Sequence, residues 1–89
     1  MGKVGITLKV MPVSPDVDMA KLRENVEKKV VEIGGMFREA KEEPIAFGLK
    51  ALVCIIIWPE DKDPDAVETE LAKVKDVNSI NVIDVRRLI

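Results

Sequence analysis

Histidine and tyrosine are both absent from this 89-residue sequence, and it contains one cysteine. Without histidine or paired cysteines, a zinc or other soft-metal site lacks its usual ligands, and no internal disulfide can form. No nucleophile and base can be paired either, which disfavours an enzyme. Cys54 lies within an apolar run, where a buried thiol packs as a small hydrophobic side chain. We therefore expect no metal, no cofactor and no catalytic residues.

Aromatic residues are scarce, because only Phe37, Phe47 and Trp58 are present. A small RNA-recognition module stacks bases on aromatic side chains of its central strands, and none of the three stands at such a position. Basic residues are not in excess, since 14 Lys and Arg face 16 Asp and Glu for a net charge of -2. Phosphate contacts require a concentrated positive charge. We expect no direct nucleic-acid binding and favour a protein partner.

Long apolar runs are missing as well. The longest is far too short to cross a bilayer, and the first ten residues alternate polar with apolar instead of forming the core of a signal peptide. These features, with the lone thiol, predict a cytoplasmic protein that does not enter a membrane. The length suits one domain over residues 1–89, and 47% hydrophobic with 34% charged residues is typical of a globular protein.

The first half of the chain shows a strand, a helix and a weaker strand. Apolar residues with a period of two predict the first strand, at Val4, Ile6, Leu8 and Val10. Asp18 is a candidate N-cap for a helix whose apolar stripe is Met19, Leu22, Val26, Val30 and Ile33. Gly34 and Gly35 end that helix. Residues 36–43 are charged and only loosely alternating, which indicates an edge strand.

The second half repeats this order. Residues 49–58 form an almost continuous apolar run, as expected of a central strand, and Pro59 stops it. Asp63 as cap and Pro64 as first helical residue begin a short helix, with an apolar stripe at Val67, Leu71 and Val74. The last strand carries Ile80, Val82, Ile83 and Val85. Its alternation slips by one residue between Val82 and Ile83, which predicts a β-bulge.

The order βαββαβ predicts an α+β fold of the ferredoxin-like kind, in which a four-stranded antiparallel sheet carries both helices on one face. Right-handed crossovers place the first and third strands in the centre of the sheet. This fold hosts many unrelated activities, so the pattern alone leaves the function open. One alternative that stays open is a small-ligand regulatory or assembly module that dimerises through its edge strand.

Three segments carry a resemblance to a known family: "VMPVSPDVD" near the amino end, "EEPIAFGLKAL" in the middle and "VIDVRRLI" at the carboxyl end. In order, spacing and total length the chain resembles the archaeal translation elongation factor 1-beta family. The resemblance implies the ferredoxin-like fold. It also implies a guanine nucleotide exchange factor, whose partner is the GDP-bound GTPase elongation factor 1-alpha and which needs no cofactor of its own.

The middle segment places an aromatic ring, Phe47, in the connection between two strands. The resemblance implies that Phe47 inserts into the partner's G domain near the nucleotide and magnesium. Pro44 restricts the backbone before the ring, and Gly48 permits a conformation that other residues rarely adopt. The alternative is that Phe47 folds back to cover the end of the core.

The carboxyl-terminal segment aligns Arg87 with a basic side chain that reaches the partner's magnesium site in the eukaryotic members. That residue is a Lys in those members and stands one position closer to the end, and a planar guanidinium replaces a magnesium ion less well than a compact ammonium does. The alternative is that Arg86 and Arg87 are solvated charges at a strand end. We also expect Lys50 to help orient the partner and Leu88 to extend the contact.

Overall fold

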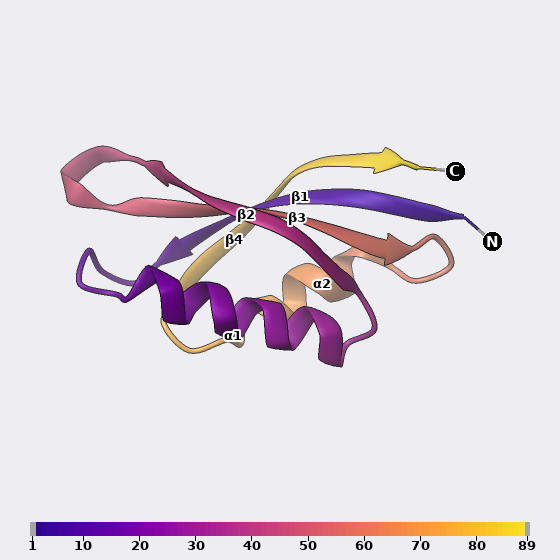
Figure 1. Cartoon of the computed structure of the whole chain (residues 1–89), viewed down its shortest axis with the longest axis horizontal. Helices are drawn as coiled ribbons and strands as arrows, with labels where there is room; N and C mark the ends of the chain where they lie inside the picture. Colours follow the sequence, from indigo (N-terminus) through magenta and orange to yellow (C-terminus); the bar gives the residue numbers. More distant parts are fainter. Residues whose placement is uncertain (1, 89) are drawn as a thin grey trace.

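The structure is a computed structural model that describes residues 2–88. Four strands and two α-helices follow one another in the predicted order (Figure 1). Their bounds are β1 Lys3–Pro12, α1 Met19–Glu32, β2 Met36–Pro44, β3 Lys50–Pro59, α2 Pro64–Leu71 and β4 Val77–Arg87, with a short 3-10 turn, η1 Ala46–Gly48, between β2 and β3.

The four strands form one antiparallel sheet in the order β2-β3-β1-β4. The prediction that the first and third strands are central is confirmed, and both helices lie on the same face of the sheet (Figure 1). The core lies between these layers, where alternate residues of the central strands meet the apolar stripes of the helices. Its largest fully buried side chains include Trp58, Ile6, Leu8, Leu22, Leu52 and Ile56. The fold is therefore ferredoxin-like.

Both helices begin at their predicted caps. The Asp18 carboxylate accepts a hydrogen bond from the Ala20 N–H at 3.0 Å, and that of Asp63 accepts one from the Asp65 N–H at 2.9 Å. The second helix is shorter than predicted, because α2 ends at Leu71 and Val74 follows it in a turn. Val74 still packs against the core, so its apolar character reflects burial rather than helical structure.

The predicted bulge in the last strand is confirmed. Val82 is opposite Leu8 and Asp84 is opposite Thr7, so Ile83 is an extra residue without a partner on β1. The charged strand β2 lies at the other edge of the sheet, as predicted. Within residues 2–88, neither helix has the length and apolar character that crossing a bilayer requires.

Candidate functional site

The connection between β2 and β3 is a tight turn with unusual backbone angles. The Leu49 N–H donates to the Ala46 carbonyl at 3.2 Å, and the two residues between them both have positive φ, 60° at Phe47 and 75° at Gly48. This is the pattern of a type I′ turn, whose central positions favour Asn, Asp and Gly. The expectation for Gly48 is confirmed. A phenylalanine at such φ is unusual and costs on the order of 1 kcal/mol.

The ring of Phe47 is 94% exposed, and it is the most exposed of the large apolar side chains in the described part of the chain. The alternative in which Phe47 covers the end of the core is therefore wrong. Pro44 is the last residue of β2 and pairs with Lys50, the first of β3. The Ile45 N–H donates to the Leu49 carbonyl at 2.8 Å, which closes the loop beneath the ring. The hairpin therefore presents Phe47 on an ordered base.

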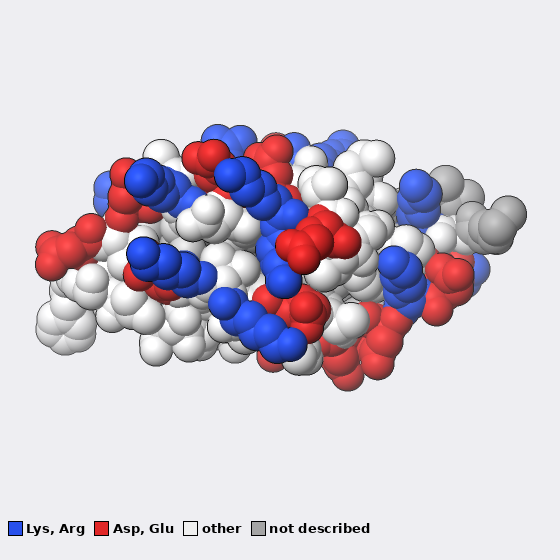
Figure 2. Space-filling view, turned by 90° about the horizontal axis from the view of Figure 1, so that it is seen from below, with Lys and Arg blue, Asp and Glu red and all other residues white. Residues whose placement is uncertain are grey.

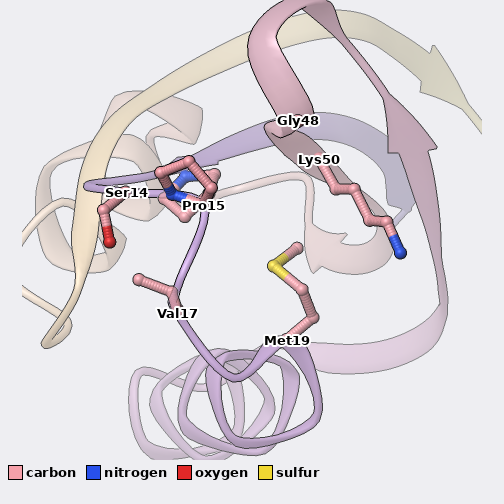
Figure 3. Close-up of a pocket in the computed structure, with 7 residues that line it drawn as sticks. Ser14, Pro15, Val17, Met19, Gly48 and Lys50 are labelled. Carbon is pink, nitrogen blue, oxygen red and sulfur yellow. The ribbon is translucent and has the colours of Figure 1, made fainter.

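A second loop lies beside this turn. The loop between β1 and α1 approaches the hairpin, and a pocket of about 140 Å³ separates them (Figure 3). Ser14, Pro15 and Val17 line the pocket from the loop, and Met19 lines it from the start of α1. Gly48 and Lys50 line it from the hairpin. The Lys50 ammonium lies 3.7 Å from a Glu42 carboxylate oxygen. The position of this loop beside the hairpin was not predicted from the sequence. Its segment "VMPVSPDVD" was nevertheless one of the three that carry the resemblance.

The carboxyl-terminal end of the sheet has a different character. Arg87 ends β4 opposite Val4, and its guanidinium Nη2 lies 2.7 Å from Oε1 of Glu60. Leu88 is about half-exposed and packs over Gly5, where an added methyl group would come within 3.4 Å of Leu88 Cδ2. Arg87 thus makes an ion pair, and its side chain is still mostly exposed to solvent at the strand end, as the alternative expected. The contribution of Glu60 was not predicted.

The residues predicted to contact the partner are divided between two ends of the sheet. Pro44, Phe47, Gly48 and Lys50 lie at the hairpin, whereas Arg87 and Leu88 lie at the opposite end (Figure 1). The ten residues of β3 connect the two ends, a span of about 30 Å at roughly 3.3 Å per residue. Phe47 and Arg87 are therefore too far apart to contact one magnesium ion together.

The charges of the helix side are mixed. Figure 2 shows Lys and Arg interspersed with Asp and Glu there, without a broad patch of one sign. Several of these side chains pair within or between helices, such as Lys28 with Glu24 at 3.4 Å and Lys73 with Glu70 at 2.8 Å. The hydrogen bond from Lys73 and the charge of the same ammonium lower the pKa of Glu70. A partner that bound this face through charges would therefore have to contact individual side chains, because the described residues form no broad charged patch there.

Cys54 lies in the middle of β3 and is fully buried. Burial raises the pKa of its thiol from the ordinary value of about 9 to about 12, against a small opposing effect of Arg23. A thiol with this pKa stays protonated at neutral pH and is a poor nucleophile. The prediction of a buried, packing cysteine is confirmed.

The structure defines a small α+β domain of the ferredoxin-like class, with an aromatic ring exposed at one end of its sheet and an arginine at the other. Over residues 5–88 the sequence matches the family model described as the EF-1 guanine nucleotide exchange domain. The chain belongs to this family.

Similar proteins from archaea match this chain along nearly all of their length. Elongation factor 1-beta of Methanothermobacter thermautotrophicus is 43% identical over 89 residues, with 99% of each chain covered. The protein of the same name from Methanobrevibacter smithii is 42% identical over 89 residues, again with 99% of each chain covered. That of Haloarcula marismortui is 42% identical over 89 residues, covering 99% of this chain and all of the relative.

Proposed function

We propose that this chain is a single-domain exchange factor that binds the GDP-bound form of elongation factor 1-alpha in the cytoplasm and promotes replacement of GDP by GTP. The observation that carries the proposal is Phe47, a ring 94% exposed in a turn whose backbone disfavours it. An aromatic side chain that is neither buried nor well suited to its turn contributes nothing evident to folding. Such a residue fits a pocket on a partner.

The energetics require more than the ring alone. A GTPase that binds GDP with nanomolar affinity has a binding free energy of about -12 kcal/mol, and a thousandfold faster release requires a barrier lower by about 4 kcal/mol. Burial of one aromatic side chain contributes roughly 1.5 to 3 kcal/mol. A second contact is therefore needed, and the other end of the sheet supplies one.

The separation of about 30 Å along β3 lets only one end of the domain reach the nucleotide. Arg87 fits that place better, because a guanidinium forms charge-assisted hydrogen bonds with the phosphate or carboxylate oxygens that surround magnesium. We assign Arg87 and Leu88 to the neighbourhood of the nucleotide and magnesium. Phe47, supported by Pro44 and Gly48 and bordered by Lys50, then anchors the domain in a separate apolar pocket of the partner.

Stopped-flow release of a fluorescent GDP from elongation factor 1-alpha of the same source tests the proposal. Addition of the chain should accelerate release by orders of magnitude, with a rate that saturates as its concentration rises. Linkage also requires that excess GDP weaken binding of the chain by the same factor by which the chain weakens GDP. An unchanged release rate at saturating chain would contradict the proposed function. A small-ligand module would instead respond to a metabolite and ignore the GTPase.

A further inference from the structure

We propose that Glu60 is a positioning residue for exchange, because its carboxylate holds the Arg87 guanidinium at the end of the sheet. The inference rests on the role that the proposed function gives to Arg87. Glu60 Oε1 lies 2.7 Å from Arg87 Nη2, within the range of a charge-assisted hydrogen bond. The two residues are 27 positions apart in the chain, so the pair depends on the fold and not on local sequence.

The backbone around the pair is held on both sides by β1. The Glu60 N–H donates to the Gly2 carbonyl at 3.0 Å, and the Leu88 N–H donates to the Lys3 carbonyl at 2.9 Å. Because β1 lies between β3 and β4, the side chains of Glu60 and Arg87 join across its end. Both partners therefore start from ordered backbone.

The turn that carries Glu60 is also attached to the helix layer. The Lys62 ammonium donates to the Ile33 carbonyl at 3.2 Å and lies 5.3 Å from the centre of the Trp58 ring. These contacts connect the turn after β3 to the end of α1 and to the core. Glu60 consequently has a firm support from which to hold a long and flexible arginine.

The two side chains differ in exposure in a way that suits their roles. The Glu60 side chain is 35% exposed, whereas that of Arg87 is 70% exposed. A guanidinium has five N–H donors, and a carboxylate oxygen occupies only part of them. Glu60 therefore holds Arg87 while most of the arginine side chain stays accessible to a partner. An arginine that is already restrained loses less side-chain freedom on binding.

Arg86 provides a comparison within the same strand. It is also exposed, at 80%, and its Nε lies 2.6 Å from Oδ2 of Asp84, two residues earlier. This pair lies within β4 and connects no other strand. Asp84→Ala is therefore the matched control for Glu60→Ala, since each removes a carboxylate from one of two adjacent arginines.

The experiment measures GDP release against chain concentration for Glu60→Ala, Glu60→Gln, Arg87→Ala and the double variant Glu60→Ala with Arg87→Ala. Glu60→Ala should lower the maximum rate about three- to fivefold, as expected for loss of one partly exposed pair. The half-saturating concentration should change less, because Phe47 provides most of the affinity. Glu60→Gln keeps a hydrogen-bond acceptor and should retain most of the rate. Asp84→Ala should exchange as the unmodified chain does.

The double variant separates the inference from the proposed function. It should be no slower than Arg87→Ala alone, because Glu60 acts through Arg87. Two results would overturn the role of Glu60 and leave the proposed function standing. One is a double variant that exchanges more slowly than Arg87→Ala alone. The other is a Glu60→Ala variant that exchanges normally although Arg87→Ala is slow. If Arg87→Ala exchanges normally, the assignment of Arg87 fails and this inference fails with it. Thermal unfolding of each variant checks that it is folded. If Glu60→Ala is not folded, Glu60→Ser takes its place in the single and double variants, because it also removes the carboxylate and should show the same loss.

Discussion

The two ends of the sheet offer a partner opposite kinds of contact. At the hairpin, Phe47 is an uncharged ring held out by a turn that strains its backbone. At the other end, Arg87 is a charge held by a carboxylate from another strand. Apolar burial gives affinity that salt hardly weakens, whereas an exposed charge acts at short range on other charges and is screened. In the proposed mechanism, one end of the sheet holds the GTPase and the other end acts on its nucleotide.

The two ends are also held in place differently. The hairpin is local, since two backbone hydrogen bonds within residues 45–49 close it. The carboxyl-terminal end depends on the register of β4 along β1 and on a turn that follows β3. Loss of the sheet should therefore abolish the action of Arg87 and the fixed distance to Phe47, although the turn itself could form locally. The paired strands β3 and β1 connect the two ends and set the distance between them.

The largest expected effect is on the free energy of unfolding at high pH. It arises from Cys54 in β3, one of the strands that connect the two ends of the sheet. Its pKa is about 12 in the folded chain and about 9 when unfolded, so between these pH values the folded state binds more protons. The free energy of unfolding must then fall as the pH rises above 9, by as much as about 4 kcal/mol near pH 12. Below pH 9 the thiol is protonated in both states and contributes no pH dependence. Denaturant unfolding between pH 8 and 11.5 measures the slope.

Cys54→Ala is the control for that slope. The variant should begin less stable, because a buried side chain is shortened, but lose less stability with rising pH. Effects of pH on the rest of the chain are shared by both proteins and cancel in the difference. Parallel curves for the two proteins would show that the buried thiol is not the source of alkaline sensitivity.

The next effect removes the apolar contact. Phe47→Ala should leave the fold intact, because the ring is 94% exposed, and slow catalysed GDP release at least tenfold, about 1.4 kcal/mol. The loss should appear mainly as a higher concentration of the chain needed for half of the maximum release rate. Its size should differ little between low and high salt. Stopped-flow GDP release at two ionic strengths provides both readings. Val31→Ala shortens another exposed apolar residue, 61% exposed on α1, and should exchange normally. An equal loss in both variants would remove any special role from Phe47.

Most of the fold follows from the sequence because burial patterns are local. Period-two and helical spacing located β1, β4 and both helices, and the slip at Ile83 located the bulge. A continuous apolar run located β3, whereas β2 was inferred from a charged, loosely alternating segment beside it. The end of α2 was misplaced because Val74 is buried from a turn, and periodicity cannot separate the two cases. The division of the site was already implicit in the topology, since antiparallel β1 and β4 carry the chain end away from the hairpin. The Glu60 contact was not predictable, because a pair 27 residues apart depends on side-chain placement across β1.

A smaller effect is expected at the charged end. Arg87→Ala should lower the maximum rate of GDP release about three- to fivefold at low salt, since one partly exposed charge contact is lost. The difference from the unmodified chain should shrink as salt is raised, in contrast to Phe47→Ala. Arg86→Ala, which removes the neighbouring guanidinium, should leave the rate nearly unchanged. If Arg86→Ala were as slow as Arg87→Ala, general positive charge rather than the Arg87 position would explain the loss.

The smallest effect is one of stability, and it tests whether the hairpin is strained for the sake of its ring. Phe47 has φ of 60° at a position of a type I′ turn where asparagine is favoured. Phe47→Asn should therefore raise the free energy of unfolding by about 0.5 kcal/mol and Tm by about 2–4 °C. Phe47→Ala keeps a Cβ at this φ without the local side-chain hydrogen bonds that offset the steric conflict for asparagine, so it should gain nothing. Both variants should lose exchange. Equal Tm values for the two variants would show that the backbone at Phe47 carries no such strain. A more stable but inactive Phe47→Asn would mean that the native residue is kept for binding, against the preference of its own turn.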